Sequence, residues 1–456
     1  RGAAHQVRTT ATGSIILESA LMPCPCLARD DASSFVPLDG DANPSNFLQP
    51  ELNAGGALDV IMIRHADGSL SSTELFVVFD SLAAPESVHV TLNGQVWDMG
   101  EFSLQATKVH AAAHFLGPSI EAASASTVPP PELLRHLSGS FGHGLIRDGR
   151  NEICYHVGSD RVRQCVRAFL YVWDAATPAV VFDIDGTVTL NDIAGQMANF
   201  IDGSPTHDGV CEMLCQLHAR GYHVVYLTSR PLLGPSGIER TRRFLFQVAV
   251  DATGYRMPPA AVVTTTHMST WSALTSELSG GSKAFKSAAL QRIRDAFRPL
   301  PLEGSDLTSL PGMHTDGGGL FAGFGNREKD ALAYLSAGVP PERIFLIDTS
   351  SRIVGRAAVL LSHRMEAGRC SVTGGSRPGT SHGRDGSALD QTPPFAAQAL
   401  EPAAQPTWQS YQGMIVSMLN HLFPMRCNET TFMHSINQYA ALAAAHQHDL
   451  SNKQLW

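Results

Sequence analysis

Short apolar runs alternate with amphipathic segments between residues 179 and 347, and this alternation restricts the possible folds more than any other feature of the chain. The apolar runs lack polar residues at every second position, which is typical of strands buried on both faces. We expect strands at Ala179–Phe182, Val224–Leu227, Ala261–Thr264, Leu320–Phe324 and Ile344–Ile347, and helices at Asp208–Ala219, Ile238–Val250, Ala284–Phe297 and Lys329–Ala337. This order predicts an α/β fold with a doubly wound parallel sheet, whose ligands bind at the carboxyl ends of the strands.

Composition excludes several classes of protein. Hydrophobic residues make up 43% of the 456 residues and charged residues 16%, as in folded globular chains. The net charge of -9 argues against a protein that coats nucleic acid through bulk electrostatics. The apolar runs are far shorter than the roughly 18 residues that a membrane-spanning helix needs. Eight scattered cysteines do not suggest a disulfide scaffold, so we expect a reducing compartment.

A smaller β module is predicted from residues 49–116. Two β-branched runs, Ala57–Arg64 and Glu74–Phe79, flank the turn residues Asp67-Gly68 and predict a hairpin. The run Val88–Leu92 reaches Asn93-Gly94, a second hairpin turn, and Val96–Met99 is the expected returning strand.

Three stretches lack any apolar period. Residues 1–48 are predicted to be a disordered arm, 117–150 a linker or insertion around Pro129–Pro131, and 366–406 a disordered insertion. Residues 407–424 should then form a helix that packs back on the sheet, because the apolar residues of Tyr411–Phe423 share one helical face. The tail, residues 425–456, contains the Ala-rich run Tyr439–Ala445, for which we expect a helix of unknown use.

The most informative motif is the run from Val180 to Thr187. A buried strand delivers Asp183 and Asp185, and its period of two places both carboxylates on one side of the carboxyl end. Such a pair repels itself unless a cation neutralises it, and oxygen ligands favour Mg²⁺. The alternatives are a calcium loop and a plain turn. A calcium loop needs a longer acidic pattern between two helices, which is not found here.

Polar residues follow two other strands. Thr228 and Ser229 come after Val224–Leu227 and could hold a phosphate, although such residues are usually caps. Asn326 and Asp330 follow Leu320–Phe324 and offer a second oxygen ligand and an acid in the next helix. Near the start of another helix, Lys283 or Lys286 could reach a phosphate as a point charge.

These four pieces, in this order, resemble the motif set of the haloacid-dehalogenase phosphatase superfamily. Within it the chain resembles the lipins, the Mg²⁺-dependent phosphatidate phosphatases. The resemblance rests on Asp183–Thr187, Tyr226–Arg230, Lys283–Lys286, Phe324–Asp330, Gly338–Pro340, Arg343–Phe345, His421–Pro424 and Leu170–Trp173. Independently, Gly56–Gly94 looks like the amino-terminal lipin module. Together the two matches cover roughly residues 50–115 and 150–424.

The resemblance implies a role for each motif residue. Asp183 would be the nucleophile that forms an aspartyl-phosphate, and Asp185 the general acid and base. Mg²⁺ would be held by the Asp183 carboxylate, the Asp185 main-chain carbonyl and Asn326. Phosphate would be bound by Thr187, Thr228, Ser229 and Lys286. Asp330 would orient Asn326 or Lys286.

The resemblance also implies an organisation and a place in the cell. Residues 151–365 would form the catalytic domain, with the strands of residues 151–173 completing an immunoglobulin-like sandwich with the β module. The implied partner is phosphatidic acid in membranes, reached by a cytoplasmic protein peripheral to the endoplasmic reticulum and nuclear envelope, with no transmembrane segment and no nucleic acid. The sequence does not identify a membrane-binding element, because prolines interrupt the residues before Leu58. Two other functions stay open: a non-catalytic phosphatidate-sensing module, and a phosphatase of a soluble phosphate ester.

Overall fold

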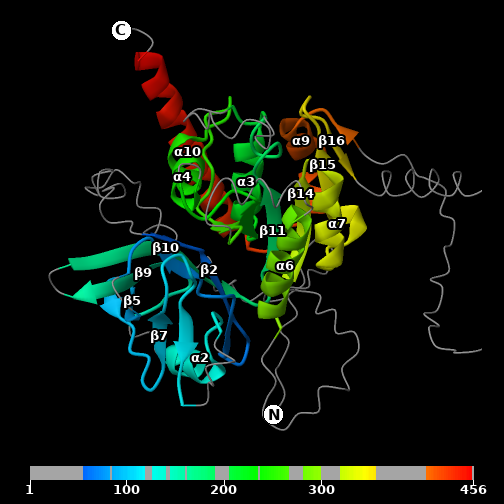
Figure 1. The fold of residues 1–456 in the computed structure, drawn as a ribbon. Coiled ribbons are helices and arrows are strands. Elements are labelled where there is room, and N and C mark those ends of the chain that lie inside the picture. The colour runs from blue at the N-terminus through cyan, green and yellow to red at the C-terminus, as the bar shows by residue number, and fades with distance from the viewer. Residues whose placement is uncertain are drawn as a thin grey trace, which may run out of the picture.

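A computed structural model describes residues 55–82, 85–118, 126–139, 144–159, 162–190, 205–234, 237–266, 281–298, 319–355 and 407–453. The predicted arm and the insertion at 366–406 lie outside these residues. Figure 1 shows two units, a β-rich one up to residue 174 and a mixed α/β one from residue 178 onward.

The α/β unit is built on a seven-stranded sheet in the order β13-β12-β11-β14-β15-β16-β17. The strands are β11 (Pro178–Asp183), β12 (His223–Thr228), β13 (Ala261–Thr264), β14 (Gly319–Gly325), β15 (Ile344–Ile347), β16 (Ile353–Gly355) and β17 (Thr407–Trp408). The first five in this order are parallel, and the last two join one edge antiparallel. The predicted doubly wound parallel sheet is therefore confirmed, with an antiparallel edge that the sequence did not indicate.

Helices cover both faces of this sheet (Figure 1). One face carries α3 (Val210–Ala219), α4 (Ile238–Arg243) with the π-helical turn Phe244–Val248, and α9 (Tyr411–Leu422). The other carries α6 (Gly281–Ala296) and α7 (Glu328–Ser336). Neighbouring residues of β11 point to opposite cores, Phe182 with α9 and Val181 with α6, as expected for a strand buried on both faces. The predicted packing of residues 411–423 on the sheet is confirmed.

The β-rich unit has an eight-stranded sheet in the order β3-β2-β10-β9-β5-β7-β8, with β6 paired to β5, and a two-stranded sheet of β1 and β4. Its strands are β1 (Gly55–Ala57), β2 (Val60–Arg64), β3 (Leu70–Ser72), β4 (Val77–Phe79), β5 (Glu86–Leu92), β6 (Gln95–Val96), β7 (Ser103–Ala106), β8 (His114–Leu116), β9 (Gly149–Ser159) and β10 (Val162–Asp174). Strands from residues 149–174 thus share a sheet with strands from residues 60–116. The parallel pair of β2 and β10 lies near one edge of this sheet, with only β3 beyond β2.

Two local predictions are corrected. The hairpin around Asp67-Gly68 closes with β3, whereas Val77–Phe79 pairs antiparallel with Gly55–Ala57. The stretch 117–150 is not only linker, because residues Pro131–Ser138 form α2. Proline at the first position of a helix lacks only an N–H that would have no partner, so Pro131 starts this helix rather than breaking it. Three leucines of α2 are buried in the β-rich core: Leu133, Leu134 and Leu137.

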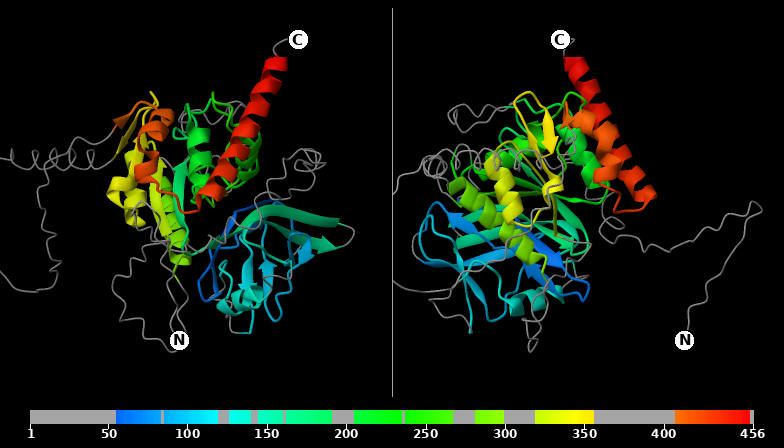
Figure 2. Two further views of the ribbon diagram at one scale, coloured as in Figure 1. Left: turned by 180° about the vertical axis from the view of Figure 1, so that it is seen from behind. Right: turned by 90° about the vertical axis from the view of Figure 1, so that its right-hand side faces the viewer.

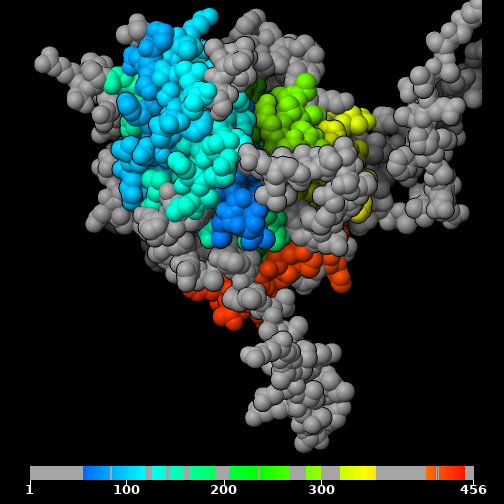
Figure 3. Space-filling view, turned by 90° about the horizontal axis from the view of Figure 1, so that it is seen from below, coloured from blue at the N-terminus to red at the C-terminus, as the bar shows by residue number. Residues whose placement is uncertain are grey.

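A buried ion pair joins the two units. Arg242 on α4 donates to the Asp59 carboxylate at 2.5 Å, and Asp59 also accepts from the backbone N–H groups of Phe169 and Val262 at 3.0 and 2.8 Å. The sequence pattern predicts that Arg242 lies on one solvated helix face together with Arg240 and Arg243. For Arg242 this prediction is wrong, because its side chain is only 6% exposed. Figure 3 shows the β-rich unit lying against the α/β unit.

The carboxyl-terminal residues extend the predicted Ala-rich helix in both directions. Helix α10 (Glu429–Lys453) packs on α3 through Tyr439 and then projects away from the sheet (Figure 2). Among the described residues, no helix is long and apolar enough to cross a bilayer.

Candidate active site

Strand β11 brings Asp183 to the carboxyl edge of the sheet, between β12 and β14. Every residue of β11 is buried, and Asp183 is 3% exposed. The loop that follows turns sharply at Gly186, whose φ of 77° lies in the left-handed region that favours glycine. The predicted strand-end position of the first carboxylate is confirmed.

Lys286 lies between two buried carboxylates. Its Nζ is 2.6 Å from Asp183 Oδ1 and 2.7 Å from Asp330 Oδ1. Asp183 comes from β11, Lys286 from α6 and Asp330 from the first turn of α7, so three elements meet at this point. Lys286 is one of the two lysines considered from sequence; the side chain of Lys283 is not among those described.

Asp183, Lys286 and Asp330 are all buried, and their burial and mutual charges shift pKa values in this cluster. Burial raises the pKa of Asp183 to about 7, although Lys286 opposes the shift. Burial alone would lower the pKa of Lys286, but Asp183 and Asp330 raise it above its ordinary value. One lysine thus faces two carboxylates, so a negative charge remains that a divalent cation at Asp183 could use.

Asp185 is held by Thr228 and Arg230. Thr228 Oγ1 donates to Asp185 Oδ2 at 3.0 Å. Arg230 Nη2 donates to Oδ1 at 2.7 Å, and Nε is 3.2 Å from both carboxylate oxygens. Sequence reasoning gave Arg230 no role, although it lies inside the Tyr226–Arg230 motif. Arg230 is itself fixed by Thr241 Oγ1 at 3.3 Å and is 7% exposed.

Asn326 lies directly over the loop of the aspartate pair. A Cβ added to Gly186 would fall 2.0 Å from Asn326 Nδ2, so only glycine allows this approach. Asp330 Oδ2 accepts from the Asn326 backbone N–H at 3.3 Å, which connects Asp330 to both residues that it was expected to orient. Asp183, Asn326 and the Asp185 main-chain carbonyl offer only oxygen donors to a metal, and this set fits Mg²⁺.

Thr187 is the predicted site residue whose surroundings differ most from expectation. It is fully buried, and its Oγ1 has no hydrogen-bond partner among the described residues. Its carbonyl accepts from Tyr411 Oη of α9 at 3.1 Å. In this structure Thr187 therefore anchors the closing helix to the aspartate loop. Ser229, in contrast, is half-buried at the end of β12.

His207 also supports the aspartate loop, and sequence reasoning missed it. Its Nε2 is 3.3 Å from the Gly186 carbonyl, and its Nδ1 is 2.8 Å from Ser351 Oγ. Burial lowers the pKa of His207. No spacing around this histidine in the sequence signals the contact, because Ser351 lies 144 positions away.

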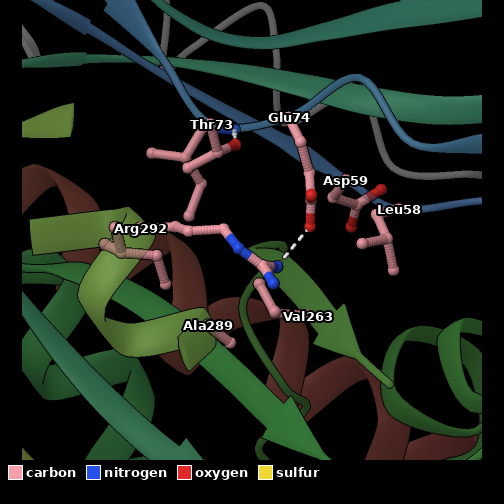
Figure 4. Close-up of a pocket in the computed structure, with 9 residues that line it drawn as sticks. Leu58, Asp59, Thr73, Glu74, Val263, Ala289 and Arg292 are labelled. Atoms are coloured by element: carbon pink, nitrogen blue, oxygen red, sulfur yellow. Dashed lines mark hydrogen bonds and ion pairs between the residues drawn. The ribbon is translucent and has the colours of Figure 1, made fainter. Parts of the chain in front are cut away.

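A small cavity lies elsewhere, at the junction of the two units (Figure 4). It has a volume of about 20 Å³, enough for roughly one water molecule. Glu74 and Arg292 point toward each other beside it and form an ion pair at 2.5 Å. None of the predicted site residues lines this cavity.

The sheet order and the aspartate pair at its edge place the α/β unit among the haloacid-dehalogenase-like proteins. The family model described as LNS2 (Lipin/Ned1/Smp2) matches residues 134–365, just over half of the chain. The chain belongs to this family.

Several curated proteins are similar over the same region. Nuclear elongation and deformation protein 1 of Schizosaccharomyces pombe is 31% identical over 221 residues, which are 48% of this chain and 30% of that protein. Phosphatidic acid phosphohydrolase 1 of Saccharomyces cerevisiae is 32% identical over 206 residues, covering 45% and 22% of the two chains. Phosphatidate phosphatase PAH1 of Arabidopsis thaliana is 31% identical over 211 residues, covering 46% and 21%. The matched region thus spans less than a third of each of these relatives.

Proposed function

We propose that the protein is a Mg²⁺-dependent phosphatidate phosphatase, which hydrolyses phosphatidic acid to diacylglycerol and phosphate. The observation that carries this proposal is the Lys286 bridge between Asp183 and Asp330, at a strand end beside a second aspartate. Two of the relatives described above carry phosphatidate phosphatase or phosphohydrolase in their names. The proposed nucleophile, Asp183, lies 2.6 Å from the Lys286 amine, and this supports an enzyme rather than a non-catalytic sensing module.

Asp183 is the proposed nucleophile. Its carboxylate oxygen attacks the phosphorus of phosphatidate, a P–O bond forms to Asp183, and the ester P–O bond to diacylglycerol breaks. Lys286 stabilises the negative charge that develops on the phosphoryl oxygens and orients the attacking carboxylate. Thr228 and Ser229 offer hydroxyl and backbone donors at the end of the neighbouring strand. Thr187 is proposed to act through the shape of the loop, since its hydroxyl is buried.

Asp185 is the proposed general acid and base. It protonates the departing diacylglycerol oxygen, and then accepts a proton from the water that hydrolyses the aspartyl-phosphate. In the structure its carboxylate accepts from Thr228 and Arg230, and these two contacts fix its orientation.

Mg²⁺ is proposed to bind at the Asp183 carboxylate, the Asp185 carbonyl and Asn326. When bound, it neutralises charge on the phosphate and lowers the pKa of the nucleophile. Asn326→Ala should therefore raise the Mg²⁺ concentration needed for half-maximal activity.

The test is phosphate release from phosphatidate in mixed micelles, with and without Mg²⁺. We expect Asp183→Asn to reduce turnover by at least about three orders of magnitude, and excess EDTA to stop the wild-type reaction. Wild-type-like turnover by the variant would refute the mechanism, and activity in EDTA would refute the metal. A preference for glycerol phosphate over phosphatidate in vesicles would point instead to a soluble ester as substrate.

We further propose that the β-rich unit is a split immunoglobulin-like sandwich and that the protein works at the surface of the endoplasmic reticulum and nuclear envelope. The sheet shared by residues 60–116 and 149–174 supports the first part. Deleting residues 50–115 would then uncover apolar sheet and lose both solubility and activity. A soluble, fully active fragment of residues 150–456 would contradict it.

A further inference from the structure

Two cysteines and a histidine gather on one face of the β-rich unit, outside the proposed active site. Cys154 and His156 are two residues apart on β9, and Cys165 on β10 is the direct cross-strand partner of His156. The two sulfurs and one ring nitrogen of these residues lie within 4.8 Å of one another. Both cysteines are buried, at 5% and 7% exposure. Figure 1 shows β9 and β10 side by side in this unit.

The histidine ring is oriented as a metal ligand would be. Its Nε2 is 3.2 Å from Thr91 Oγ1 on β5, whereas its Nδ1 is buried without a hydrogen-bond partner among the described residues. When Nε2 carries the proton and donates to Thr91, Nδ1 keeps a lone pair that can bind a metal. Metal-binding histidines commonly hold their second ring nitrogen in this way.

The pairing of β9 with β10 does not favour a disulfide between Cys154 and Cys165. Cys154 pairs with Arg167, so Cys154 and Cys165 are diagonal neighbours rather than direct partners. Diagonal residues of an antiparallel pair are about 7–8 Å apart, more than the roughly 4.4–6.8 Å between the Cα atoms of a disulfide. Two sulfurs that bind one metal stand farther apart than two that bind each other, so the diagonal suits a shared ion.

A cationic side chain also stands beside the thiols, because Arg167 is the direct cross-strand partner of Cys154. Glu152 accepts from Cys154 Sγ at 3.5 Å. Thiolate and imidazole donors select a borderline-soft ion over Mg²⁺, so this site and the proposed Mg²⁺ site would not compete for one metal.

We propose that Cys154, His156 and Cys165 bind a zinc ion, with water as the fourth ligand. Each thiol loses its proton to solvent as its sulfur binds the ion, and nothing is oxidised or reduced. The ion would tie β9 to β10 near the tip of their long hairpin, where β10 begins at Val162.

The test is zinc binding by the full-length chain, stripped with EDTA and kept reduced. Because Cys24, Cys26 and Cys370 lie outside the described residues, the parent carries serine at these three positions. We expect one zinc per chain by equilibrium dialysis, and thiolate-to-metal charge-transfer absorption when Co²⁺ replaces zinc. Cys154→Ser and Cys165→Ser should each weaken binding by at least about 100-fold, and Thr91→Val by about 10-fold. The matched control is Cys211→Ala, a buried thiol of α3, which should bind zinc like the parent.

Three results would overturn the proposal. The first is less than a fifth of a zinc per chain in the parent. The second is zinc binding by Cys154→Ser and Cys165→Ser that is as tight as binding by the parent. The third is a Cys154–Cys165 disulfide in freshly isolated protein. Circular dichroism of each variant without metal shows whether a loss of binding comes from misfolding. For a variant that misfolds, the Co²⁺ spectrum of the parent decides, because only thiolate ligands give the charge-transfer band.

Discussion

Arg230 donates two hydrogen bonds to the Asp185 carboxylate: Nη2 is 2.7 Å and Nε is 3.2 Å from Oδ1. Both residues stand at the carboxyl edge of the sheet, yet they come from strand ends 45 positions apart. The planar guanidinium matches the carboxylate plane, so it can fix the orientation of Asp185 as well as its charge.

The first prediction concerns this pair. Arg230→Lys should lower kcat for phosphatidate by about 10- to 100-fold with little change in KM, because lysine keeps the charge but loses the two-point grip. An unchanged kcat would show that Arg230 has no part in positioning Asp185. Arg256→Lys, on an exposed arginine, is the control.

A second prediction concerns the lysine bridge. Lys286→Met leaves Asp183 and Asp330 buried without their cation and should cost about 3–5 kcal/mol in the free energy of unfolding. Adding Asp330→Asn should recover part of that stability, but not activity. Urea unfolding of the wild type, the two single variants and the double variant gives the coupling free energy between Lys286 and Asp330. Full stability of Lys286→Met alone would mean that the two carboxylates do not depend on the lysine.

The junction of the two units gives a third prediction. Asp59→Ala removes the partner of buried Arg242 and the acceptor of two backbone N–H groups, so it should destabilise the protein by about 3–5 kcal/mol. Asp148→Ala breaks the more exposed ion pair with Arg64 and should cost less than about 1 kcal/mol. Equal losses in the two variants would contradict a special role for the buried pair.

Acid stability supplies the fourth prediction. Burial lowers the pKa of His218 to about 4, below its ordinary value of 6.5. Between these values the unfolded chain binds a proton that the folded chain does not, so stability is full above pH 6.5 and is lost as pH falls toward 4. His218→Gln should reduce this slope by up to about 1.4 kcal/mol per pH unit. Exposed His434→Gln is the control, and an equal slope in His218→Gln and the wild type would disprove the assignment.

The sequence predicted the parts of the site that depend on one strand end. Asp183 follows a run of apolar residues, and its place at the sheet edge follows from local pattern alone. The partners of Asp185 and Asp59 could not be predicted in this way. Arg230 and Arg242 reach them across the fold, and a cationic residue near a helix reads from sequence as a solvated one. His207 likewise depends on a serine far along the chain.

Helix α2 shows a second kind of limit. Its proline-rich start reads as linker, and only the burial of its leucines in the β-rich core reveals a helix. Here tertiary packing decided between two local interpretations that the composition of residues 117–150 allowed equally.

The parallel pairing of β2 with β10 bears on how the chain acquires its structure during synthesis. Asp59, directly before β2, and its partner Phe169 are 110 positions apart, so β2 leaves the ribosome long before β10 does. Until β10 has been synthesised, the edge of β2 that pairs with it has no partner. Contacts of such long sequence separation also form slowly. Strand β10 leads within a few residues into β11, but β11 pairs with β12 and β14, so Asp183 gains its place in the sheet only after Gly325 has been synthesised.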